Sequence, residues 1–165
     1  YVVDVFKAPA EPYKKDLQFI DSLQDGDILV TTVSGNNHNG YIGELLSIAC
    51  LARGARGTVL DGYARDVASI DLDHFPIYCV GLNPLDSKGR VDAIDCDIDM
   101  VCGGIMVHSG DLIFADTDGI VCIPEEHIQE VIEKALNKVS GENTVREELR
   151  RGISAVDVYE KYGIL

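Results

Sequence analysis

The stretch Thr58-Val59-Leu60-Asp61-Gly62-Tyr63-Ala64-Arg65-Asp66 sets the pattern for the first half of the chain. Its first three residues form an apolar run typical of a buried strand. Asp61-Gly62 predicts the end of that strand. A short helix is then expected to carry Arg65 and Asp66. Ligands of α/β proteins bind where strands end and helices begin, so this stretch also contains the first candidate site.

Strand and helix patterns alternate on both sides of this stretch. Upstream, residues 27–33 predict a compact strand, and residues 34–40 form a loop of turn-forming residues. Residues 43–53 predict a helix that ends at Gly54. Downstream, residues 75–81 predict another strand. Because strands and helices alternate, we expect an α/β fold with layered sheets.

The second half of the chain changes character. Residues 89–124 predict successive short strands with turns between them, including one at residues 116–119. From Pro124 the pattern is helical, with an apolar stripe between Ile128 and Val139. Gly141 is expected to interrupt it before two shorter helices. The 165 residues fit one domain of common size, so a single domain over residues 1–165 is expected.

Composition excludes several classes of function. The net charge of −14 disfavours nucleic acid, because phosphate contacts need clustered Lys and Arg. No apolar run approaches the roughly 18 residues of a membrane span. Five dispersed cysteines form no C-x-x-C motif, and three of them, Cys50, Cys79 and Cys122, lie in apolar runs. This predicts core packing in a reducing compartment, and so a cytoplasmic protein. Because the chain starts at Tyr1, we expect that an N-terminal segment of the natural product is missing.

Local chemistry suggests a site for a small acid. Gly40 and Gly43 flank the start of the predicted helix, where free backbone N–H groups bind anions. Glu44 lies in the first turn, and Arg65 and Asp66 follow the next strand. A 2-oxo acid needs an anchor for its carboxylate and a hard cation for its oxygens. From spacing alone, however, a surface ion pair is the more frequent role of an Arg-Asp pair.

A set of motifs in a characteristic order favours a functional site over a surface ion pair. The chain closely resembles the RraA-like family, which includes the class II pyruvate aldolases acting on 4-hydroxy-4-methyl-2-oxoglutarate. The resemblance covers nearly the whole chain. Its motifs are Gly43-Glu44-Leu45-Leu46, Ala52-Arg53-Gly54-Ala55-Arg56-Gly57, Asp61-Gly62-Tyr63-Ala64-Arg65-Asp66, Phe75-Pro76-Ile77-Tyr78, Gly81-Leu82-Asn83-Pro84, and residues 103–107 and 110–121.

The resemblance implies a fold and an assembly. The family has a layered β/β/α domain, like the swivelling phosphohistidine domains of phosphotransfer enzymes. Its members are homotrimers or hexamers, built as dimers of trimers, with sites at subunit interfaces. The N-terminal helical part of the family is expected to be missing from this chain.

The resemblance also implies roles for individual residues. By that match Asp66 ligates Mg²⁺ or Mn²⁺ directly, and Glu44 holds a water bound to the metal. Arg65 contacts the oxygens of the substrate and stabilises the enolate. Backbone N–H groups near Gly43, Leu45 and Leu46 bind the pyruvyl carboxylate, and a metal-bound water shuttles the proton.

An acidic residue from a neighbouring subunit also approaches the metal waters in the family. Glu142, just after Gly141, is the best match here, and Glu147 and Glu148 are close rivals. Two departures stand out. Glu44 replaces the Asp of the best-known aldolases, and Ser69 stands where some members carry another acid.

Three functions remain open from the sequence. The first is a metal-dependent aldolase with oxaloacetate decarboxylation as a second activity. The second is a regulator that binds ribonuclease E or a helicase without catalysis. Family members of that kind lack an acid at the position of Glu44, so Glu44 favours the enzyme. The third is an older family label, a methyltransferase acting on demethylmenaquinone. The chain has no glycine-rich adenosylmethionine loop after its first strand, which disfavours that role.

Overall fold

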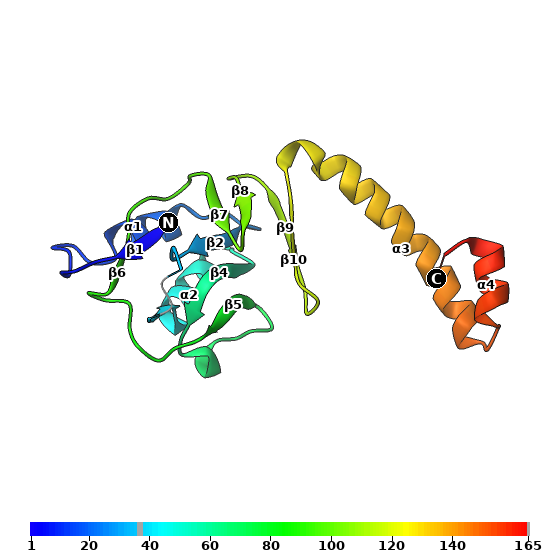
Figure 1. Cartoon of the computed structure of the whole chain (residues 1–165), viewed down its shortest axis with the longest axis horizontal. Helices are drawn as coiled ribbons and strands as arrows, with labels where there is room; N and C mark the ends of the chain where they lie inside the picture. The colour runs from blue at the N-terminus through cyan, green and yellow to red at the C-terminus, as the bar shows by residue number, and fades with distance from the viewer. Residues whose placement is uncertain (36–37, 165) are drawn as a thin grey trace. The chain divides into compact units, whose positions relative to one another are not determined.

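Strand β4 (Gly57–Ala64) is the centre of the main sheet in this computed structural model, which describes residues 1–35 and 38–164 (Figure 1). It pairs in parallel with β2 (Ile28–Thr32), β3 (Gly40–Ile42) and β5 (Ile77–Leu82). β2 runs beside the first part of β4, and β3 pairs only with its last residues, Tyr63 and Ala64. The carboxyl ends of β3, β4 and β5 therefore meet at one edge of the sheet.

The predicted break at Asp61-Gly62 is wrong. β4 continues through both residues, because its pairing with β3 and β5 extends to Ala64. Gly62 fits inside the strand because it has no side chain; a Cβ there would lie 2.7 Å from a methyl carbon of Val33. The predicted helix carrying Arg65 and Asp66 is also wrong. The short 3₁₀ helix η1 (Val67–Ser69) starts only after them.

The helices α1 (Lys14–Ser22) and α2 (Glu44–Ala52) contribute to the core around this sheet. Ile20 from α1 and Cys50 from α2 are buried with Leu60 and Phe75. Cys50 behaves as a packing residue, since burial raises the pKa of its thiol to about 11. All five cysteines are free thiols. Of the three cysteines predicted to pack in the core, Cys50 is buried, whereas Cys79 and Cys122 are half-buried.

The strand-rich middle of the chain contains the predicted short strands, and they form two-stranded sheets. The turn between β9 and β10 is closed by the N–H of Asp116, which donates to the carbonyl of Gly119. The side chain of Asp116 accepts from the N–H of Asp118, which is an ordinary Asx turn. The pairs are β1 (Val2–Asp4) with β6 (Val91–Ala93), β7 (Met100–Cys102) with β8 (Ile105–Val107), and β9 (Leu112–Ala115) with β10 (Ile120–Ile123).

Residue contacts divide the described chain into two compact units. The first contains Tyr1–Ser109 and Ala115–Ile120, and therefore the main sheet. The second contains Gly110–Phe114 and the chain from Val121 onward. The expectation of a single domain over residues 1–165 stays a prediction. Together the two units form a mixed α/β chain, which confirms the predicted fold class.

The second unit is mainly helical, with η2 (Glu125–His127), α3 (Ile128–Arg150) and α4 (Ala155–Tyr162). α3 packs on α4, and Val145 and Val158 are buried. The predicted interruption at Gly141 is wrong, because a helical glycine costs only about 1 kcal/mol. A Cβ at Gly141 would meet the side chain of Ile164 at 2.9 Å, so the glycine makes room for the chain's end.

The helices of the described residues differ from membrane spans. None of them combines the length and the apolar character needed to cross a bilayer.

Candidate active site at the end of the central strand

Arg65 and Asp66 follow β4 directly and face the start of α2. Gly43 is the residue before α2. A Cβ added to Gly43 would lie 2.8 Å from Oδ2 of Asp66 and 3.1 Å from both Cγ and Cζ of Arg65. The structure therefore brings together three residues that the sequence placed in one site.

Two glycines let the Arg65 side chain pack closely against the backbone. The N–H of Arg65 donates to the carbonyl of Ile42 at 2.8 Å, which continues the pairing of β3 with β4. A Cβ at Gly40 would lie 2.7 Å from Cβ of Arg65 and 2.4 Å from the carbonyl oxygen of Asn83. The sequence explains Gly40 and Gly43 only as neighbours of a helix start. The space that Arg65 occupies is a second reason for both.

Asp66 has an uncommon backbone conformation. Its φ of 56° lies in the left-handed region, where Asp is tolerated better than most residues. Its carboxylate is 45% exposed and forms an ion pair with Nη1 of Arg65. Its carbonyl accepts from the N–H of Ser69 at 3.0 Å, which starts η1. Such backbone strain clusters at functional sites.

The first turn of α2 provides backbone donors beside this pair. Gly43 is extended and no side chain caps the helix. The carbonyl of Gly43 accepts two hydrogen bonds from Ser47, one from its N–H at 3.0 Å and one from its hydroxyl at 2.9 Å. The N–H groups of Glu44, Leu45 and Leu46 have no acceptor within an α-helix, so they can bind an anion. Glu44 is half-buried in this turn.

Asp86 is a site residue that the sequence reasoning missed. Its Oδ1 lies 3.2 Å from Nη2 of Arg65, whereas Asp66 pairs with the other terminal nitrogen, Nη1. The hydroxyl of Tyr13 is 3.4 Å from the other carboxylate oxygen. Burial, followed by the charge of Asp86, raises the pKa of Tyr13. No local motif signals Asp86, because only the return of the chain after β5 brings it to Arg65.

Asn39 was missed as well. Within the described residues, the buried side-chain atoms without a hydrogen-bond partner are both amide atoms of Asn39 and Nε of Arg65. Asn39 is 2% exposed and precedes Gly40, which contacts Arg65. A buried polar group without a partner costs about 1–3 kcal/mol, so each of these two side chains indicates a place where water or a ligand can supply the partner. Two neighbours of Asn39 in the predicted loop, Asn36 and Asn37, lie outside the described residues.

The donors at this site fit a hydrated hard cation. Across residues 1–35 and 38–164, no three His, Cys, Asp or Glu side chains gather closely enough to enclose a metal. Mg²⁺ does not need such a cage, because it keeps several waters and is commonly held by one or two carboxylates. Asp66 has a partly exposed carboxylate, and Glu44 lies in the adjacent helix turn. Both oxygen donors suit Mg²⁺ or Mn²⁺.

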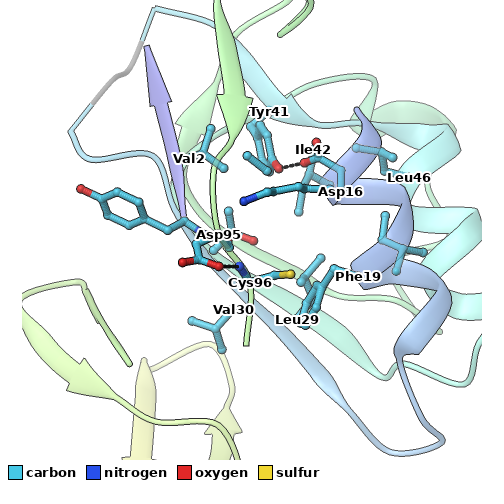
Figure 2. A pocket seen from close by; sticks show the side chains of 15 residues that line it. Val2, Asp16, Phe19, Leu29, Val30, Tyr41, Ile42, Leu46, Asp95 and Cys96 are labelled. Carbon is cyan, nitrogen blue, oxygen red and sulfur yellow. Dashed lines mark hydrogen bonds between the residues drawn. The ribbon is translucent and has the colours of Figure 1, made fainter. Parts of the chain in front are cut away.

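A separate cavity of about 60 Å³ lies between α1, β2 and the start of α2 (Figure 2). Of the predicted site residues, it includes only Leu46. At its wall the Tyr41 hydroxyl donates to the carboxylate of Asp16, a buried pair that the sequence did not reveal. Burial raises the pKa of both groups. The cavity has room for a few waters, so it does not replace the site at Arg65.

The three candidate acids for the neighbouring subunit's contribution all lie on α3. Glu148 accepts from Lys161 and from the Tyr162 hydroxyl, at 2.8 and 2.9 Å. Glu147 forms an ion pair with Arg150 at 2.7 Å. Glu142 has a looser ion pair with Lys138 at 3.8 Å. Glu142 therefore has the weakest partner of the three carboxylates, although its side chain is 35% exposed against 56% for Glu147.

Comparisons with known proteins identify the family of the chain. The family model described as RraA-like: Aldolase/RraA matches residues 3–122. A protein of Halalkalibacterium halodurans, named putative 4-hydroxy-4-methyl-2-oxoglutarate aldolase, is 28% identical over 81% of this chain and 63% of its own length. The chain spans only 23%, 59% and 63% of the length of three curated relatives that it matches.

Solved structures show the same fold. An uncharacterized protein of Pseudomonas syringae matches 98% of this chain and 76% of its own, with a TM-score of 0.81 and 26% identity. RraAS2 of Streptomyces coelicolor, described as an unusual member of the RNase ES inhibitor RraA protein family, is 29% identical. It matches 82% of this chain and 71% of its own, with a TM-score of 0.69. The predicted RraA-like fold is thereby confirmed.

Proposed function

This chain belongs to the RraA-like (Aldolase/RraA) family, and we propose that it is a divalent-metal-dependent lyase that releases pyruvate from 2-oxo acids. The proposed substrates are of the 4-hydroxy-4-methyl-2-oxoglutarate type, with oxaloacetate decarboxylation as a second activity. Two relatives named as putative aldolases of this kind support the substrate class.

One observation carries the proposal: the start of α2 touches Arg65 and Asp66. The distances from Gly43 leave no space for a side chain between the helix and the pair. A surface ion pair has no need for such an approach to a helix start. A site for a 2-oxo acid does need it, because the acid presents a carboxylate and a carbonyl oxygen to two different partners.

The backbone of α2 and the side chain of Arg65 have separate proposed roles. The N–H groups of Leu45 and Leu46 would bind the substrate carboxylate at the positive end of the α2 dipole. Arg65 would donate to the oxygen that gains negative charge as the C3–C4 bond breaks. Both proposed reactions leave this charge on a pyruvate enolate, so one arrangement serves both.

A divalent cation, Mg²⁺ or Mn²⁺, would be held by Asp66 directly and by Glu44 through water. When bound, it would polarise the 2-oxo group and stabilise the developing negative charge. Glu44 is longer than the Asp of the best-known aldolases, so it can reach a water that a shorter side chain would not.

We further propose a homotrimer or hexamer with sites at its interfaces. Exposed apolar side chains on α2 support an interface there, with Leu45 79% and Ile48 54% exposed. Glu142 of a neighbouring subunit is the acid proposed to reach the site. Its carboxylate is held only loosely within its own chain.

The test is an assay of pyruvate release from a panel of 2-oxo acids, with Mg²⁺, with Mn²⁺ and with chelator. We expect release that requires the metal and falls at least a hundredfold in Arg65→Ala. Arg56→Ala is the matched control, because Arg56 forms an exposed ion pair with Asp25 and should be dispensable. Metal-independent release, or none from any acid in the panel, would contradict the proposal.

The alternative function is that of a regulator without catalysis. The 29% identity to the Streptomyces RNase ES inhibitor family member favours this possibility. A regulator of this kind would bind ribonuclease E or a helicase whether or not Asp66 is present. Capture of such a partner by both the wild type and Asp66→Ala, with no pyruvate release by either, would favour it over the lyase.

A further inference from the structure

The guanidinium of Arg65 lies between two carboxylates. Its Nη1 pairs with Asp66, and its Nη2 lies 3.2 Å from Oδ1 of Asp86. The Arg65 side chain is only 25% exposed, whereas the two carboxylates are 45% and 47% exposed. Asp66 is the proposed metal ligand, while the proposed reaction gives Asp86 no part.

The backbone around Asp86 is anchored to the same sheet edge as Arg65. The N–H of Gly40 donates to the carbonyl of Leu85 at 2.8 Å, and Gly40 forms a parallel bridge with Asp86. On the other side, the guanidinium of Arg90 donates to the carbonyl of Asp86 at 2.9 Å. The Asp86 carboxylate therefore approaches Arg65 from a fixed backbone.

A cation at Asp66 must compete with Arg65 for the same carboxylate. Arg65 would remain paired with Asp66 if it had no second acidic partner, because a half-buried guanidinium needs its charge balanced. Asp86 supplies that partner at Nη2, the terminal nitrogen that Asp66 does not contact. Arg65 can then lose its contact with Asp66 without moving out of the site.

We infer that Asp86 is a positioning residue, which holds Arg65 in place for the substrate while Asp66 turns to the divalent cation. The inference rests on the proposed function, since it assumes that Asp66 binds a metal. Asp86 itself touches neither metal nor substrate in this arrangement. It acts through Arg65, and its effect should therefore disappear when Arg65 is removed.

The test is a double-mutant cycle read by Mn²⁺ binding in calorimetry, without substrate. Asp86→Asn keeps the shape of the side chain and the acceptor for Tyr13, but it removes the charge. We expect it to weaken Mn²⁺ binding about tenfold, because Arg65 then stays on Asp66. In an Arg65→Gln background the same change should alter affinity less than twofold.

Activity gives a second measurement. At saturating Mn²⁺, Asp86→Asn should lower kcat/KM for pyruvate release at least tenfold, and Asp86→Glu should recover part of it by restoring the charge. Thermal unfolding of each variant shows whether the fold is kept. Partial recovery in Asp86→Glu, together with coupling to Arg65, supports positioning rather than a structural role.

Three outcomes would overturn the inference. Equal loss of Mn²⁺ affinity in both backgrounds would mean that Asp86 acts only as a nearby charge. Unchanged affinity in Asp86→Asn would mean that Arg65 needs no second anchor. Failure of the wild type to bind Mn²⁺ would remove the metal step of the proposed function, and this inference with it. The first two results would overturn this inference and leave the proposed function intact, whereas the third would contradict both.

Discussion

At the scale of single residues, the site depends on the absence of a side chain at Gly43 as much as on the side chains of Arg65 and Asp66. Gly43 is extended, with a φ of −136°, so its backbone would accept any residue. Its importance lies in the space that it leaves for Asp66 and Arg65. A side chain at this position should therefore lower activity and metal affinity more than it lowers the stability of the fold.

Gly43→Ala tests this idea. The added methyl group would push against Oδ2 of Asp66 at 2.8 Å, so the carboxylate must move. We expect pyruvate release and Mn²⁺ affinity to fall at least tenfold, while the free energy of unfolding changes by less than about 1 kcal/mol. Enzyme assays, calorimetry and urea unfolding measure the three quantities. Retention of full activity would show that the close approach of the start of α2 to Arg65 and Asp66 is not needed for pyruvate release.

Asp16 predicts a pH dependence. Burial is the largest cause of its raised pKa, and the hydrogen bond from Tyr41 opposes it. A carboxyl whose folded pKa is raised binds more protons in the folded state. Stability is therefore lost as the pH rises from the ordinary value of 3.8 through the raised value.

Asp16→Asn keeps an acceptor for Tyr41 and cannot ionise. Relative to wild type, its free energy of unfolding should therefore improve between pH 4 and pH 7. Urea unfolding at both pH values measures the difference. Asp25→Asn, at an exposed position, is the control and should show a smaller change. An Asp16→Asn variant with the same relative stability at both pH values would contradict the prediction.

At the scale of secondary-structure elements, helix α4 illustrates how local signals and packing combine. The hydroxyl of Ser154 accepts from the N–H of Asp157 at 3.1 Å, which caps the helix. Val158 is fully buried, and Val145 on α3 is 4% exposed. The Ser154 cap stabilises the first turn of α4, and burial of Val158 stabilises the packing of α4 on α3.

Val158→Ala should cost about 2 kcal/mol, because it removes two buried methyl groups and leaves a cavity. Hydrogen exchange should increase in α4 and in the last turns of α3. Val156→Ala is the matched control on the same helix, since Val156 is 66% exposed and its loss should cost under about 0.5 kcal/mol. Equal costs for the two variants would mean that α4 does not depend on packing.

At the scale of the whole molecule, the proposed assembly can be tested through shared sites. If Glu142 completes the site of a neighbouring subunit, each site draws on two chains. A mixed oligomer then contains some sites that receive both intact parts. Such complementation is a direct consequence of interfacial sites.

Asp66→Ala and Glu142→Ala should each be inactive alone, and mixing them after reversible dissociation should restore part of the activity. Arg65→Ala mixed with Asp66→Ala is the control, and it should stay inactive because both changes affect the same chain's part of the site. Sedimentation should give a mass that is a multiple of 18.0 kDa. An active monomer, or no recovery in the mixture, would contradict interfacial sites.

Much of the fold could be predicted from the sequence because its signals are local. Apolar runs marked β2 and β5, and helical spacing with Gly54 at the end marked α2. The turn at residues 116–119 followed from Asp and Gly. Ordered motifs identified the family and singled out Gly43, Arg65 and Asp66. For these features, neighbouring residues contain the information.

Other features depended on tertiary contacts. β4 passes through Asp61-Gly62 because Asp61 still pairs with Thr32 of β2 and because pairing with β3 and β5 resumes at Tyr63, which outweighs the local turn preference. The local preference remains visible as a shift of register with β5 between Leu60 and Tyr63. Asp86 reaches Arg65 only through the return of the chain after β5, and the buried Asp16 meets Tyr41, 25 residues away, only in the folded chain. The sequence thus determined which groups can do chemistry. The tertiary structure decided which of them meet, because contacts between distant segments leave no local pattern.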